Sequence, residues 1–75
     1  MAIFIIEGKD LDGKTIWVQD VEYTTYSKEI VSLSLTKDYD EAFKTNISDA
    51  VDILKRLKNE NKKYEWSVIN YSTFY

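Results

Sequence analysis

The chain has 75 residues, of which 44% are hydrophobic and 31% charged, and it carries a net charge of −3 with no cysteine and no histidine. This composition excludes disulfide bonds and the nitrogen and sulfur ligands of zinc, copper and haem sites, and it removes the residues on which most nucleophilic and acid–base catalysis depends. We therefore expect a cytoplasmic, non-enzymatic protein without cofactor or metal, folded as one domain over residues 1–75 and stabilised as a homodimer.

Two strands joined by a hairpin are predicted at the start of the chain. The run AIFII at residues 2–6 is apolar and rich in β-branched side chains, which is typical of a central strand covered on both faces. Gly8 and the pair Asp12-Gly13 can supply the positive φ that a hairpin turn requires. The second strand follows with TIWVQ at residues 15–19.

The spacing of apolar residues predicts a bulge in the second strand and a half-covered third strand. Apolar side chains change from even to odd positions near Gln19 and Asp20, which an extra residue in the strand would explain. In IVSLSLT, residues 30–36, apolar and polar residues alternate, so one face of this strand should be core and the other polar. The expected core residues of this strand are Val31, Leu33 and Leu35.

One amphipathic helix is predicted over residues 46–59. Asn46 is a suitable N-cap, and basic residues lie near the C-terminal end, where the helix dipole favours them. Asp38 precedes Glu41 by the spacing of a capping box, which indicates one short helical turn before the main helix. The apolar face expected to cover the sheet consists of Ile47, Ala50, Val51, Leu54 and Leu57.

A last strand is predicted over residues 64–69, where Tyr64, Trp66 and Val68 share one face. The expected element order is β-β-β-α-β, with the first and last strands as neighbours in the middle of the sheet. The expected fold class is therefore α+β, an antiparallel-dominated four-stranded sheet with one amphipathic helix packed on one face.

Charge is unevenly distributed along the chain. Residues 1–54 contain eleven carboxylates and five lysines, whereas residues 55–63 contain five bases and one acid. The acidic part could imitate nucleic-acid phosphates on a DNA-binding protein, or it could simply be a solvated surface. The basic part could contact nucleic acid, or it could serve only the helix dipole and the charged helix face. The candidate nucleic-acid-binding residues are Lys55, Arg56, Lys58, Lys62, Lys63 and Trp66.

The two Trp, six Tyr and three Phe residues exceed the number of aromatic side chains that one helix on a small sheet readily buries. Trp17 is expected to point away from the core face, and Tyr71, Phe74 and Tyr75 lie beyond the last expected core position. Aromatic side chains often anchor protein interfaces. The C-terminal tail therefore either forms an interface or folds back over the sheet of its own subunit.

The order LTKDYDEAF, TNISDAVDILKRL and YEWSVI, which covers roughly residues 33–69, resembles small, mostly uncharacterised proteins encoded by phages of Gram-positive bacteria. Such proteins often act early in infection by binding one host protein, such as a sliding clamp or a nuclease, and some acidic, dimeric examples occupy a DNA channel. The resemblance implies a protein that inhibits or modulates a host DNA-handling protein, and it supplies no active site. The candidate partner-binding residues are Asp10, Asp12, Trp17, Asp38, Asp40, Glu41, Tyr71, Phe74 and Tyr75.

Overall fold

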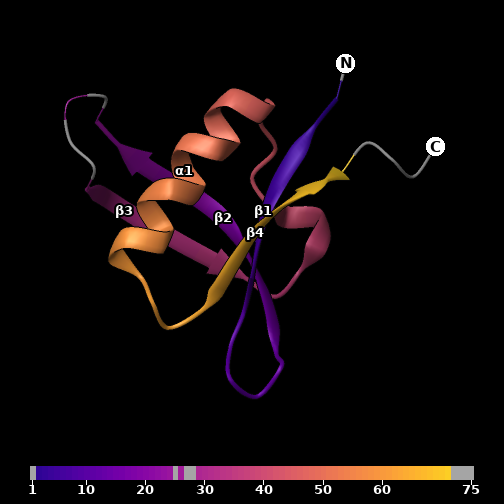
Figure 1. Cartoon of the computed structure of the whole chain (residues 1–75). Helices are drawn as coiled ribbons and strands as arrows, with labels where there is room; N and C mark the ends of the chain where they lie inside the picture. Colours follow the sequence, from indigo (N-terminus) through magenta and orange to yellow (C-terminus); the bar gives the residue numbers. More distant parts are fainter. Residues whose placement is uncertain (1, 25, 27–28, 72–75) are drawn as a thin grey trace.

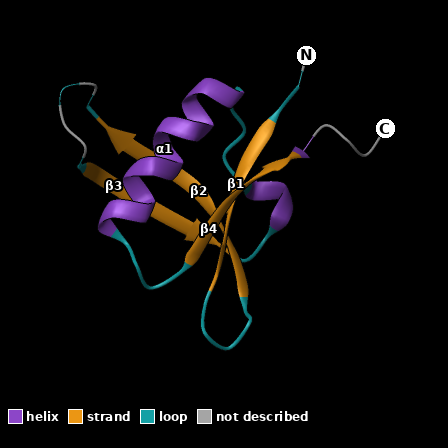
Figure 2. Ribbon diagram, in the orientation of Figure 1, coloured by secondary structure: helices purple, strands orange, loops and turns teal. Residues whose placement is uncertain are grey.

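An antiparallel four-stranded sheet carries one helix across one of its faces (Figures 1 and 2), which confirms the predicted α+β fold. The computed structural model describes residues 2–24, 26 and 29–71. In chain order, the elements are β1 (Phe4–Lys9), β2 (Thr15–Tyr23), β3 (Ile30–Thr36), the 3₁₀ turn η1 (Tyr39–Glu41), α1 (Ile47–Glu60) and β4 (Glu65–Asn70).

β1 lies inside the sheet, whose strand order is β3-β2-β1-β4. The first and last strands are neighbours, as predicted, but β4 forms an edge of the sheet and does not lie in its middle. Ile5 and Ile6 point to opposite faces and are 0% and 1% exposed, so β1 is covered on both faces. Below, the inner face is the one that carries Ile6 and α1, and the outer face is the one that carries Ile5.

The main core lies between the inner face and α1. Asn46 caps the helix as predicted, because its side-chain oxygen accepts the Asp49 N–H at 2.8 Å. The expected helix face is partly wrong, since Ile47 is 49% exposed and Ile53, which was not expected, is buried. The first turn begins outside the core, so the buried stripe is centred further along the helix. The buried core residues are Ile6, Val18, Val21, Ile53, Leu57 and Trp66.

Two bulges set which side chains of β2 and β3 face α1. The pairing shifts between Val18 and Asp20, which confirms the bulge expected near Gln19. A second shift leaves Val31 as the extra residue of β3, because Ile30 pairs with Tyr23 and Ser32 pairs with Glu22. Ile30 therefore packs against the core, whereas Val31 is 67% exposed, contrary to its expected core position. Leu33 and Leu35 pack partly buried against the core, as expected.

The β1–β2 hairpin uses its two glycines differently. Gly13 has a positive φ of 82°, as expected, and its N–H donates to the Asp10 carbonyl at 3.1 Å. Gly8 does not have a positive φ, so that prediction is wrong. A Cβ at position 8 would lie 2.7 Å from the Trp66 ring, so the role of Gly8 is to make room for the indole.

The chain passes from the outer face to the inner core just before α1. The expected short turn is confirmed, because η1 is capped by the Asp38 side chain, which accepts the Asp40 N–H at 3.0 Å. The Tyr39 ring contacts Trp17 on the outer face, whereas Phe43 packs against the inner core. Phe43 N–H donates to the Val18 carbonyl at 2.7 Å.

Two hydrogen bonds then join this segment to the other inner strand. Phe4 and Thr45 exchange backbone hydrogen bonds of 2.8 and 2.9 Å. The segment is thus tied to β1 and β2 at the point where the two strands stop pairing with each other. It closes the gap between them.

Candidate functional site

Asn61 organises the turn between α1 and β4. Its N–H donates to the Leu57 carbonyl at 2.8 Å and ends the helix, and its side-chain oxygen accepts the Lys63 N–H at 3.1 Å. Its own carbonyl accepts the Trp66 Nε1–H at 2.8 Å. These bonds fix the turn to the buried indole. The side chains of Lys62 and Lys63 are therefore held at the surface beside Trp66.

A groove of about 480 Å³ lies between this turn and the base of the β1–β2 hairpin. Trp66 is 4% exposed, and the Tyr64 ring lies 5.3 Å from it. Four lysines and only two carboxylates, Asp10 and Glu65, line the groove. The lysines are Lys9, Lys58, Lys62 and Lys63.

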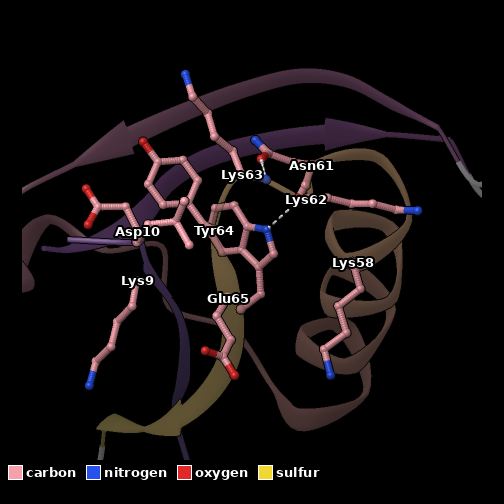
Figure 3. Close-up of a pocket in the computed structure, with 10 residues that line it drawn as sticks. Lys9, Asp10, Lys58, Asn61, Lys62, Lys63, Tyr64 and Glu65 are labelled. Carbon is pink, nitrogen blue, oxygen red and sulfur yellow. Dashed lines mark hydrogen bonds between the residues drawn. The ribbon is translucent and has the colours of Figure 1, made fainter. Parts of the chain in front are cut away.

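The four lysines do not converge on one point. In Figure 3 their side chains extend outward in different directions around the groove, from the hairpin, the helix and the turn. Such an arrangement creates a positive region for an extended anion such as a phosphodiester chain. It does not form a cage around a single small anion.

The predicted nucleic-acid-binding set divides in two. Lys58, Lys62, Lys63 and Trp66 line the groove, whereas Lys55 and Arg56 do not. Trp66 is buried and its N–H is already donated, so its ring is not available for stacking on a base. The partly exposed aromatic ring in the groove is that of Tyr64.

Arg56 has a structural role on another side of α1. Its guanidinium lies over the Tyr23 ring, 4.2 Å from the ring centre, and donates to the Thr24 carbonyl at 3.2 Å. The pKa of Tyr23 is raised above its ordinary value, mainly by burial and then by the nearby negative charge of Asp49, although the Arg56 charge acts in the opposite direction. Lys55 is exposed on the helix surface.

The predicted acidic residues fall into two groups, one in the β1–β2 hairpin and one around η1. Asp10 shapes the hairpin, because its Oδ1 accepts the N–H groups of Asp12 and Lys14, each at 2.9 Å. The Asp12 side chain is exposed at the turn. Figure 2 shows the hairpin loop at one end of the sheet and η1 beside the sheet, so the two groups do not form one cluster.

Around η1, the acidic side chains take part in local hydrogen bonds and remain exposed. Asp38 caps the turn, and Asp40 Oδ1 accepts from the Tyr71 hydroxyl at 3.4 Å. Glu41 Oε2 accepts from the Thr36 hydroxyl at 3.4 Å. These carboxylates can still present charge to a partner, because all three residues are exposed.

The predicted aromatic anchors that the structure describes pack within the chain. Tyr39 stands edge-on to Trp17 at 5.4 Å and stacks on Tyr71 at 5.2 Å. Tyr71 N–H also donates to the Ile3 carbonyl at 2.7 Å. The start of the tail thus folds back over its own sheet, which was one of the two alternatives. Phe74 and Tyr75 lie outside the described residues.

Sequence reasoning missed five residues that line the groove: Lys9, Leu11, Asn61, Tyr64 and Glu65. Lys9 reaches it because β1 pairs with β4, which places Lys9 opposite Glu65. Asn61 at the helix end has the chemistry of a capping residue, and this was the available signal. Within the described ranges, no three His, Cys, Asp or Glu residues are placed to hold a metal ion, and no helix is long and apolar enough to cross a membrane.

Comparisons with family models, with curated proteins and with solved structures gave no match to this chain.

Proposed function

We propose that this protein is a small, non-enzymatic, phage-type protein that binds a host DNA-handling protein, such as a replication clamp or a nuclease, and inhibits or modulates it. One observation carries the proposal: nine of the eleven carboxylates in residues 1–54 belong to exposed residues, while only five lysines lie in the same part of the chain. A protein that grips DNA presents a positive surface, and an exposed negative surface is complementary to it.

The exposed acids of the hairpin and of η1 supply this complementarity. Asp12, Asp40 and Glu41 are suitable contact residues because they are exposed and lie in the hairpin turn and in η1. In a dimer the negative field would be doubled, so the protein could occupy a DNA-binding channel as a mimic of the phosphates.

Affinity capture from a Gram-positive bacterial lysate, with quantitative mass spectrometry, tests this function. The wild-type chain is expected to enrich one DNA-handling protein, and duplex DNA added in excess is expected to displace it. The triple variant D12N/D40N/E41Q should lose most of the captured partner. The control D20N/E22Q/D52N removes the same charge from other exposed positions and should retain it.

Two results would count against the proposal. Capture of no protein above background would remove its basis. An equal loss of the captured partner in both triple variants would show that net charge alone, and not the assigned residues, governs binding.

A second candidate function is nucleic-acid binding at the lysine groove. It is favoured by the way the fold adds Lys9 to Lys58, Lys62 and Lys63 around one groove. Fluorescence anisotropy with short single-stranded DNA is the appropriate measurement, and affinity should fall steeply between about 50 mM and about 200 mM salt. K62E/K63E should abolish binding, while K55E, an exposed lysine outside the groove, should have little effect. Unchanged anisotropy at low salt would exclude this candidate.

A further inference from the structure

One end of the sheet collects the ends of all four strands. Lys9, the last residue of β1, pairs with Thr15 and Glu65, the first residues of β2 and β4. Thr36, the last residue of β3, pairs with Trp17 of β2. Figure 1 shows the hairpin loop, the end of β3 and the turn from α1 to β4 gathered at this end. It is called the hairpin end below.

Two hollows at the hairpin end share Tyr64. The lysine groove, of about 480 Å³, is the first, and a second hollow of about 420 Å³ lies between the start of β2 and Lys37. Tyr64 and Asp10 line both of them. Tyr64 is partly exposed, and its ring centre lies 5.3 Å from that of the buried Trp66. The Tyr64 ring is therefore a supported, partly exposed surface where the two hollows meet.

Positive charge is concentrated around these two hollows. Six of the ten Lys and Arg residues of the chain line them, but only two of the thirteen Asp and Glu residues do. The rest of the chain is therefore strongly negative, and it repels a polyanion that does not lie at the hairpin end. The six lysines are Lys9, Lys14, Lys37, Lys58, Lys62 and Lys63.

The ammonium groups of these six lysines are free to bind a ligand. Among the residues that the structure describes, none of the six makes a hydrogen bond or an ion pair through its side chain. Lys44, which lies outside both hollows, instead donates to the carbonyls of Asp40 and Ala42 at 2.8 and 3.1 Å. Asp10 is less available to oppose an anion, because its Oδ1 already accepts two backbone N–H groups.

We propose that a single-stranded nucleic acid binds along the hairpin end, with its phosphates on the lysines of both hollows and one base stacked on the Tyr64 ring. This inference rests on the second candidate function, nucleic-acid binding at the lysine groove. It adds the second hollow, the stacking residue and the preference for an unpaired strand.

The Tyr64 ring and the shape of the site favour this ligand over other polyanions. Aromatic rings between basic side chains bind single strands by stacking on their bases, whereas a duplex keeps its bases inside the helix. Each hollow has the volume of a small-molecule site, which is sufficient for a nucleotide-sized group. The surface of an anionic membrane is too flat to enter them.

Fluorescence anisotropy with a labelled oligothymidylate of about 12 nucleotides tests the role of the second hollow. K14Q/K37Q should weaken binding about tenfold at about 50 mM salt. It should also reduce the slope of log K against log salt by about 1.4, because each phosphate contact on a single strand contributes about 0.7. The control K44Q/K55Q removes the same charge outside both hollows and should change the affinity by less than about twofold.

Substitutions of Tyr64 test the stacking. Tyr64→Leu keeps an apolar side chain against Trp66 but removes the flat ring, so it should weaken binding about tenfold. The salt slope should stay unchanged, because stacking releases no counterion. Tyr64→Phe retains the ring and should bind like the wild type. Both variants should keep the circular dichroism spectrum of the wild type.

The inference is overturned if K62E/K63E loses binding while K14Q/K37Q and Tyr64→Leu bind like the wild type. The second candidate function would then stand, with the strand confined to the first groove. Equal affinity for a duplex of the same length would also overturn the inference, as would binding to vesicles of anionic lipid without binding to the oligonucleotide at higher affinity. If the wild type does not bind the oligonucleotide at about 50 mM salt, both the candidate function and the inference fail.

Discussion

The two tryptophans show how differently the two faces of the sheet are built. Trp66, on the inner face, is 4% exposed, and its N–H donates to the Asn61 carbonyl. Trp17, on the outer face, is only partly buried, and its buried Nε1 has no hydrogen-bond partner among the described residues. The inner face is a packed core, whereas the outer face is a layer of aromatic rings from separate parts of the chain. We therefore expect substitutions on the inner face to cost more stability.

Gly8→Ala should have the largest effect, because the new Cβ would lie 2.7 and 2.9 Å from two atoms of the Trp66 ring. The indole is held by its hydrogen bond and cannot easily move, so we expect a loss of about 2.5 kcal/mol of unfolding free energy in urea titration. Adding Trp66→Leu should relieve part of this loss in a double-mutant cycle. If the losses of unfolding free energy from the two substitutions simply add, the proposed role of Gly8 is contradicted.

The tryptophans themselves allow a matched comparison. Trp66→Phe leaves the Asn61 carbonyl without its donor and reduces the core volume, so it should cost about 2 kcal/mol. Trp17→Phe removes an N–H that has no partner among the described residues, so it should change stability by less than about 0.5 kcal/mol. Equal losses of unfolding free energy for the two variants in denaturant titrations would show that the two faces of the sheet contribute equally to stability.

On the outer face, Tyr71→Ala removes a ring that stacks on Tyr39 and lies under the Lys44 ammonium group at 4.9 Å. The expected cost is about 1 kcal/mol. Tyr26→Ala is the control, because Tyr26 is 99% exposed. Thermal unfolding should distinguish the two variants, and a loss of the same size at both positions would refute the packing role of Tyr71.

The smallest expected effect concerns the pH dependence of stability. The pKa of Tyr23 is higher in the folded chain than its ordinary value, mainly because of burial. The folded state therefore holds this proton more tightly than the unfolded state. The contribution of Tyr23 to the free energy of unfolding is unaffected at neutral pH, and it decreases as the pH rises above the ordinary tyrosine pKa. Urea titrations between about pH 7 and about pH 11 should show a steeper alkaline loss in the wild type than in Tyr23→Phe.

The candidate groove could be predicted only in part from the sequence. The run KRLKNENKK identified Lys58, Lys62 and Lys63, since adjacent positions at the end of a helix remain close in space. Lys9 is far away in the chain and joins the groove only through the β1–β4 pairing. Arg56 was expected beside the other bases, but it lies over Tyr23 because its helical position points toward β2.

The sequence by itself determined the helix and the strands, together with the caps, turns and bulges that depend on neighbouring residues. The Asn46 cap, the short turn after Asp38 and the bulge at Gln19 all follow from hydrogen bonds and spacings between residues close in the chain. Tertiary structure alone decided which strand forms the edge, why position 8 must be glycine, and that Ile30 and not Val31 packs against the core. These features depend on partners that are distant in sequence, and the periodicity of one strand or helix contains no information about what will pack against it.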